Sequence, residues 1–145
     1  MMQQFYPTPN HSFQYELNKD FHFAAAHYIP HESAGKCREV HGHTYFVNVT
    51  IAGNSLDESG FLVNFQQIKS LIHQRFDHTL LNEDFHFSNT NKDRFPTTEI
   101  VARTIYELIE RDLQTKENEP TCLQVLVRET PTSYVIYRPQ RRKNS

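Results

Sequence analysis

The sequence predicts an α+β fold with the element order ββααββ, in which a four-stranded antiparallel sheet carries two helices on one face. Three observations predict it: two alternating apolar stretches near the start, two stretches with helical spacing in the middle, and two short alternating stretches at the end. With 145 residues, the chain has a common size for one domain. We expect one domain over residues 12–138, a flexible arm over 1–11 and a short basic tail over 139–145.

Two strands are expected in the first part of the chain. From Phe13 to Phe23 the odd positions are apolar, with Lys19 as the one exception, and the even positions are polar, as in a half-buried strand. A second alternating stretch runs from Tyr45 to Ile51. The expected strands are long enough to form an antiparallel pair.

After residue 64 the apolar residues no longer alternate with polar ones but recur at helical spacing. Apolar residues recur at helical intervals from Phe65 to Phe76, and Asn64 precedes them as an N-cap. A second apolar stripe runs from Ile100 to Ile109, with Thr97 or Thr98 as its cap. Both segments are therefore predicted to be amphipathic helices that cover the sheet.

The end of the chain returns to alternation. Leu123, Val125 and Val127 predict a third strand, and residues 134–137 predict a fourth. Residues 82–96 show no period. An irregular stretch of this length is unusual in a compact domain, so it is either functional or mobile.

Composition and charge exclude several classes of protein. The formal net charge of -2 gives no electrostatic reason to expect nucleic acid or an anionic membrane as a partner. No apolar run approaches the roughly 20 residues that span a bilayer, and residues 1–11 lack the apolar stretch of a secretory signal. Cys37 and Cys122 are too few for a disulfide scaffold and are interpreted as reduced thiols. We expect a cytoplasmic protein that acts on a small molecule.

Histidine is unusually frequent, with nine residues. His41 and His43 lie two apart at the start of the second strand, so both imidazoles point to one face and can reach one ion. His27 follows the first strand and shares the parity of its apolar residues, so the sheet is expected to bring it opposite this pair. Such a pair alone is more often two solvated histidines, but three histidines without an obvious fourth ligand are typical of a catalytic zinc with one open position.

Cys37 lies four residues before His41 in a basic stretch. The flanking Lys36 and Arg38, together with a nearby metal, would favour its thiolate. The thiol is therefore a candidate base, nucleophile or fourth metal ligand, with a small apolar filler as the alternative.

Three further side chains could carry chemistry. Asp77 and His78 are an adjacent carboxylate and imidazole that could relay a proton, although their spacing alone favours a surface pair. Glu129, at the end of the expected third strand, could accept two parallel N–H bonds from a planar edge. An ordinary glutamate in an ion pair is the alternative for Glu129.

These motifs resemble the 6-pyruvoyl-tetrahydropterin synthase superfamily, and most closely its bacterial branch, the 6-carboxy-tetrahydropterin synthases of the queuosine pathway. The resemblance runs from about Phe13 to Arg138. The matching pieces, in order, are Phe23-Ala24-Ala25-Ala26-His27, Cys37, His41-Gly42-His43-Thr44-Tyr45, Gly60-Phe61-Leu62-Val63-Asn64-Phe65, Phe76-Asp77-His78, Leu81-Asn82, Pro96-Thr97-Thr98-Glu99 and Arg128-Glu129-Thr130.

The resemblance implies a role for each candidate residue. It assigns His27, His41 and His43 to Zn²⁺, makes Cys37 the catalytic base, and makes Asp77 and His78 its partners in proton transfer. It also implies that Glu129 anchors the amino-pyrimidinone edge of the pterin, with Thr97 and Thr98 in the substrate site. The three residues between Cys37 and His41 resemble the carboxypterin-forming branch. Two departures are Asn64, where the family commonly has aspartate, and Ile100, where asparagine often follows the Thr-Glu pair.

The resemblance also implies a reaction and an assembly. The expected enzyme is a zinc-dependent lyase that converts 7,8-dihydroneopterin triphosphate to 6-carboxy-5,6,7,8-tetrahydropterin, with release of acetaldehyde and triphosphate. The implied fold is the tunnelling fold (T-fold), and the implied assembly is a homohexamer of two trimers with active sites at subunit interfaces. The alternatives are the pyruvoyl-forming activity, a non-catalytic zinc-binding module that also uses Cys37 as a ligand, and a metal-free pterin-binding protein.

Overall fold

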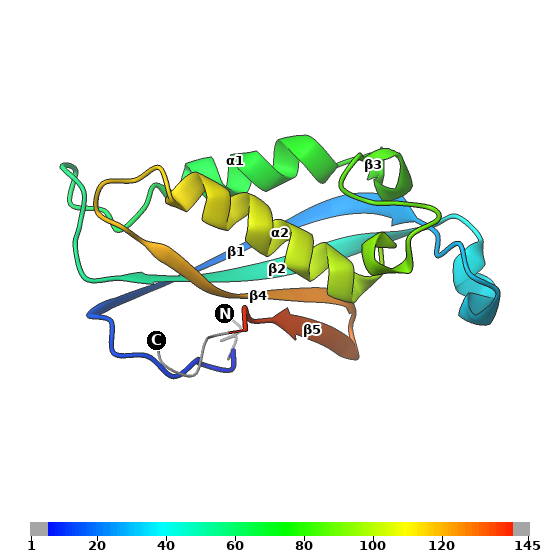
Figure 1. The fold of residues 1–145 in the computed structure, drawn as a ribbon, viewed down its shortest axis with the longest axis horizontal. Coiled ribbons are helices and arrows are strands. Elements are labelled where there is room, and N and C mark those ends of the chain that lie inside the picture. The colour runs from blue at the N-terminus through cyan, green and yellow to red at the C-terminus, as the bar shows by residue number, and fades with distance from the viewer. Residues whose placement is uncertain (1–5, 141–145) are drawn as a thin grey trace.

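The computed structural model describes residues 6–140 as an α+β protein, and it confirms the predicted fold class. Its sheet contains β1 (Tyr15–His27), β2 (His41–Gly53), β4 (Thr121–Thr130) and β5 (Ser133–Tyr137), which are antiparallel neighbours in that order. Figure 1 shows α1 and α2 on the same side of this sheet. The main difference from the prediction is a fifth strand, β3 (Thr79–Leu80), which pairs in parallel with the outer edge of β1.

The two helices begin where their predicted caps lie. In α1 (Phe65–Phe76), the Asn64 side chain accepts a hydrogen bond from the backbone N–H of Gln66. In α2 (Thr98–Leu113), Thr97 is the N-cap, because its hydroxyl accepts from the backbone N–H of Ile100 at 3.3 Å. Each cap satisfies one of the free N–H groups of the first turn.

The core lies between the helices and the odd-numbered face of β1. Phe23 and Tyr45 face each other across the first two strands, with ring centroids 5.0 Å apart, and both are fully buried. Lys19, the exception in the alternation, places its Nζ 4.8 Å from the centre of the Phe65 ring. A lysine stem can cover apolar surface while its ammonium stays at the edge, so the strand tolerates this residue.

The segment between β3 and α2 has no long helix or strand, but short turns and buried side chains hold it in place. It contains two single 3-10 turns, η2 (Leu81–Glu83) and η3 (Lys92–Arg94). Leu81, Phe87 and Phe95 from this segment are buried in or beside the core. A third 3-10 segment, η1 (Glu32–Arg38), projects beyond the end of the sheet between β1 and β2 (Figure 1).

The two ends of the chain are described in part. Residues 1–5 of the predicted arm and 141–145 of the predicted basic tail lie outside the described residues. The first described residues cross the side of the sheet opposite the helices (Figure 1), where the carbonyl of Pro7 accepts a hydrogen bond from Gln124 Nε2 at 2.8 Å. Among residues 6–140, no helix has the length and apolar character needed to cross a membrane.

Candidate active site

Three histidines meet at the end of the sheet where β1 finishes and β2 starts. His27 is the direct cross-strand partner of His41, and Ala25 is the partner of His43. The ring centroids lie 4.5 Å apart for His27 and His41, 5.1 Å for His27 and His43, and 4.9 Å for His41 and His43. The antiparallel register places these positions side by side, and their odd numbering points all three side chains to the same face of the sheet. Together these two features produce the cluster.

Glu129 of β4 completes the group. One ligand atom from each of His27, His41, His43 and Glu129 can be chosen so that all four lie within 4.8 Å of one another. Glu129 Oε1 lies 2.9 Å from His43 Nε2, and its Oε2 accepts a hydrogen bond from the Thr98 hydroxyl at the start of α2. The carboxylate is therefore held beside the histidines by a residue of the neighbouring helix.

Two of the imidazoles are oriented by backbone carbonyls. His27 Nδ1 lies 2.7 Å from the carbonyl oxygen of Pro96, and His41 Nδ1 lies 2.7 Å from that of Glu39. A carbonyl can only accept, so each Nδ1 carries a proton, and in the neutral ring the lone pair is then on Nε2. This is the arrangement that carbonyl or carboxylate partners impose on metal-binding histidines.

The buried nitrogens of the cluster fit a metal ion. His27 Nε2 is buried without a hydrogen-bond partner among the described residues, whereas the buried His43 Nε2 has the Glu129 carboxylate 2.9 Å away. A buried polar atom without a partner is costly, so a group that accepts the lone pair of His27 Nε2 is the natural complement. Burial lowers the pKa of His27, which keeps its ring in the neutral form that metals require. These observations support a divalent metal with nitrogen ligands.

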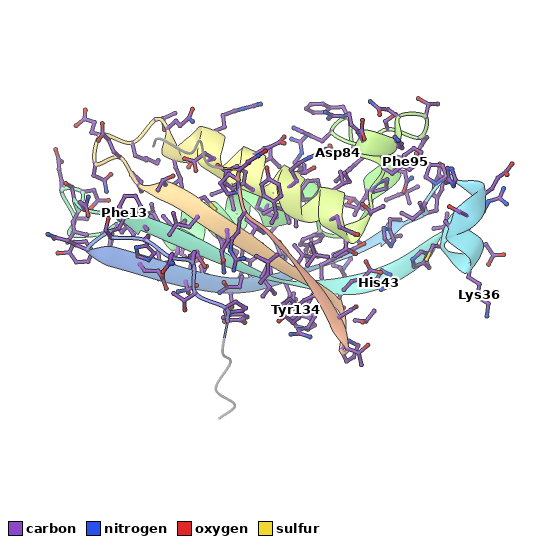
Figure 2. All side chains as sticks on the ribbon, turned by 60° about the horizontal axis from the view of Figure 1, so that its bottom comes forward. Phe13, Lys36, His43, Asp84, Phe95 and Tyr134 are labelled. Atoms are coloured by element: carbon purple, nitrogen blue, oxygen red, sulfur yellow. The ribbon has the colours of Figure 1, made fainter. Side chains whose placement is uncertain are left out.

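Cys37 lies in η1, outside the histidine cluster. Its side chain is exposed, and its backbone carbonyl accepts a hydrogen bond from the N–H of Ile29 at 2.7 Å. Figure 2 shows the neighbouring Lys36 on the part of the chain that projects beyond the sheet, while His43 lies on the sheet itself. The group of possible ligands contains Glu129 and not Cys37, which weighs against a closed site of three histidines and this cysteine.

Asp77 and His78 form a hydrogen-bonded pair between the end of α1 and β3. Asp77 Oδ1 accepts from the Ala24 backbone N–H at 2.9 Å, and its Oδ2 lies 2.7 Å from His78 Nδ1. The bond from Ala24, followed by that from His78 and the charges of His73 and His78, holds the pKa of Asp77 below its usual range. The carboxylate therefore stays ionised near neutral pH and orients the imidazole.

The backbone and exposure of His78 are unusual. Its φ is 59°, in the left-handed region that non-glycine residues rarely adopt, and its side chain is 83% exposed. It borders an open hollow that is also lined by Ala24, Ala26, Thr44 and His43, so His78 and one of the clustered histidines share this hollow. No hydrogen bond or ion pair within residues 6–140 joins Asp77 or His78 to the Cys37 side chain.

The two predicted substrate-site threonines have different contacts. Thr97 caps α2, so its hydroxyl is engaged by the backbone N–H of Ile100. Thr98 donates to Glu129 and thus belongs to the cluster. Sequence reasoning gave no role to Tyr45, which is fully buried with its ring 5.6 Å from His43 and 5.9 Å from His27. Its position next to His43 on the same strand face was the available signal.

The fold and this site define an α+β protein with a three-histidine centre suited to a divalent metal. The chain belongs to the 6-pyruvoyl tetrahydropterin synthase family, whose family model matches residues 16–140. It is 57% identical over 141 residues to 6-carboxy-5,6,7,8-tetrahydropterin synthase of Bacillus subtilis, with 97% of each chain covered.

Two further comparisons concern the family and the fold. The protein of the same name from Synechocystis is 32% identical over 129 residues, which cover 83% of this chain and 91% of that one. Among solved structures, 6-pyruvoyl tetrahydropterin synthase of Caenorhabditis elegans superposes with a TM-score of 0.67 at 24% identity, covering 87% of this chain and 96% of the other. The structural similarity supports the T-fold architecture.

Proposed function

We propose that the protein is a cytoplasmic, zinc-dependent lyase that converts 7,8-dihydroneopterin triphosphate and one molecule of water to 6-carboxy-5,6,7,8-tetrahydropterin. Acetaldehyde and triphosphate would be the other products, and the reaction would serve queuosine biosynthesis. The observation that carries the proposal is the set of three histidines and Glu129, each of which offers a ligand atom within 4.8 Å of the others. The 57% identical relative from Bacillus subtilis supports the choice of a carboxypterin product.

The histidine set fits Zn²⁺ in particular. Three neutral imidazoles with an open side are a common catalytic environment for this metal, and zinc has no redox chemistry of its own. When bound, Zn²⁺ would act as a Lewis acid toward the hydroxyls of the pterin side chain. His27, His41 and His43 are the proposed ligands.

The other residues have separate proposed tasks. Glu129, held by the Thr98 hydroxyl, presents a carboxylate that can accept N–H bonds from the amino-pyrimidinone edge of the pterin and so orient its side chain toward the histidines. The exposed Cys37 thiol is the proposed base that removes a proton from the side chain. Reduction of the ring is balanced by oxidation of the side chain, so the reaction needs no nicotinamide.

The Asp77–His78 pair is proposed to serve a neighbouring subunit. Its place at the edge of β1, where Asp77 accepts from the Ala24 N–H, and the lack of a contact to Cys37 within residues 6–140 support a site that is completed across an interface. A homohexamer of two trimers would supply such an interface. In that assembly Asp77 orients His78, and His78 exchanges protons with Cys37 or the substrate.

The direct test is product identification. We would incubate the zinc-loaded protein with 7,8-dihydroneopterin triphosphate under anaerobic conditions and identify the products by mass. The Cys37→Ala variant should retain zinc and lose at least about a hundredfold in turnover, the order of effect of removing a general base. Ser33→Ala, an exposed position of η1 on the other side of the kink at Gly35, is the matched control and should turn over normally.

Each outcome has a defined meaning. Carboxy-tetrahydropterin together with acetaldehyde supports the proposal, whereas pyruvoyl-tetrahydropterin would keep the site but change the reaction. Intact substrate with zinc bound would favour a binding protein. Loss of zinc from the Cys37→Ala variant would favour a closed site in which the thiol is a ligand.

A further inference from the structure

A buried asparagine holds the chain immediately after His27. Asn82 is 7% exposed, and its side-chain amide bonds both backbone groups of Tyr28: Oδ1 accepts from the N–H at 2.9 Å, and Nδ2 donates to the carbonyl oxygen at 2.9 Å. The second hydrogen of Nδ2 is donated to Asn89 Oδ1 at 2.9 Å. Both amide hydrogens and the carbonyl oxygen of the side chain are thus used, which fixes its orientation.

Tyr28 lies between two parts of the candidate active site. The residue before it is His27, whose ring is oriented by the carbonyl of Pro96. The residue after it is Ile29, whose N–H donates to the carbonyl of Cys37 at 2.7 Å. Any displacement of the Tyr28 backbone therefore moves a proposed metal ligand on one side and the anchor of the cysteine-bearing turn on the other.

The element that carries Asn82 is itself anchored. Leu81, directly before it, is fully buried, and Phe87 and Phe95 of the same segment are also buried. Arg75 of α1 binds the segment through Asp84, with Nε 3.0 Å from Oδ2. Figure 2 shows Asp84 and Phe95 close to the sheet end that carries the histidines. A residue bonded to this segment is therefore held to the core.

We infer that Asn82 is a positioning residue that sets the relative placement of the His27 imidazole and the Cys37 thiol. The segment 81–96 then acts as a fixed support for the site, with Asn82 at its start bonding Tyr28 and Pro96 at its end bonding His27. The inference rests on the proposed metal site and not on the identity of the pterin product.

The test replaces Asn82 by aspartate in the full chain. Asn82→Asp keeps the size of the side chain and the acceptor for the Tyr28 N–H, but it places a carboxylate oxygen against the Tyr28 carbonyl. Loss of a partner that orients a metal ligand typically lowers metal affinity by about 10- to 100-fold, and we expect a loss in this range for Co²⁺ and Zn²⁺ in chelator competition. The visible absorption of the Co²⁺-loaded variant should also change, because the His27 ring is displaced.

Turnover provides a second, independent readout. At saturating zinc, kcat of Asn82→Asp should remain at least about tenfold below wild type with KM nearly unchanged, because the displaced group is the base and not the pterin anchor. Asn89→Ala removes only the exposed acceptor that orients the Asn82 amide, and it should lower metal affinity by a smaller factor, about threefold. This variant decides the question if Asn82→Asp does not fold.

Asn118→Ala is the matched control. Asn118, in the loop between α2 and β4, also donates to two backbone carbonyls, those of Ser55 and Leu62 in the loop between β2 and α1. It should lower the unfolding temperature without changing metal affinity or the Co²⁺ spectrum. The inference would be overturned if folded Asn82→Asp had the metal affinity and the Co²⁺ spectrum of wild type. If Asn82→Asp does not fold, the same result in Asn89→Ala would overturn it. A loss of metal affinity in Asn118→Ala equal to that in Asn82→Asp would also overturn it.

The inference and the proposed function fail in different ways. If the wild-type protein binds Co²⁺ but does not convert the pterin, the proposed function fails, and the metal readouts still test Asn82. If the protein converts the pterin and Asn82→Asp matches wild type in metal affinity and spectrum, only the inference fails.

Discussion

The two cysteines occupy opposite environments. Cys37 is exposed in η1, whereas Cys122 at the start of β4 is 1% exposed, and burial raises the pKa of its thiol well above the usual range. Because the thiolate is the reactive form, we expect iodoacetamide at pH 8 to modify Cys37 and leave Cys122 untouched in the native protein. Peptide mass analysis after a short reaction checks this, with protein unfolded in urea as the control in which both react. Equal modification of the native protein would contradict the structure.

Glu129 has two possible roles, because it lies within ligand distance of the histidines and also offers a carboxylate to the pterin. We expect Glu129→Gln to keep its metal within about twofold, since the three imidazoles remain. Its affinity for the pterin should fall by about 10- to 100-fold, because a hydrogen bond to a charged group contributes about 1.5–3 kcal/mol. Metal competition and pterin binding by fluorescence measure the two effects separately.

The control for this variant is Glu107→Gln on α2, whose carboxylate is half exposed and 3.6 Å from Arg103 Nε. It should change neither affinity. Release of the metal by Glu129→Gln, with pterin binding retained, would instead make this carboxylate a fourth ligand.

At the level of elements, the stability of α2 shows whether Thr97 acts mainly as its N-cap. Its hydroxyl caps the helix, so Thr97→Ala should lower the free energy of unfolding by about 1 kcal/mol, and Thr97→Ser should restore most of it. Urea denaturation measures both, and Thr115→Ala after the end of the same helix is the control. A Thr97→Ala variant with unchanged stability and weakened pterin binding would show that the substrate-site role implied by the family resemblance is the main one.

Elements with a clear period were predictable, and those held by distant contacts were not. The stripe of α2 and the alternation of β1 repeat over many residues, so local sequence reports the buried face directly. The two residues of β3 are too few to show a period. The support given by Asn82 depends on Tyr28, 54 positions earlier in the chain, and nothing local to either residue indicates that contact.

The same distinction applies to the site within the whole molecule. The meeting of His27, His41 and His43 follows from parity and one antiparallel pairing, both of which can be predicted from the sequence. The approach of Glu129 depends on the pairing of β2 with β4, in which Val47 faces Val127, and on α2 bringing Thr98 to the carboxylate. The register of β2 and β4 could not be predicted from the sequence, so the closeness of Glu129 to the histidines was missed.

The described part of the molecule also exposes aromatic side chains and a strand edge. Phe46 is 52% exposed and Tyr134 is 47% exposed, while β5 is an edge strand of the sheet. Exposed aromatic side chains and free strand edges are common at subunit contacts. Together with the separation of Asp77–His78 from Cys37, they support the proposed hexamer.

We expect light scattering at micromolar concentration to give a mass about six times the 17.1 kDa of one chain. Phe46→Glu should reduce this mass, because it places a charge among aromatic groups that an interface would bury. Lys116→Glu, on the loop after α2, is the control for a change of charge and should keep the assembly.

If the site is completed between subunits, the dissociated Phe46→Glu protein should keep its metal and lose turnover, because His27, His41 and His43 lie within one chain. A monomeric wild-type protein with full turnover would contradict both the hexamer and the shared site.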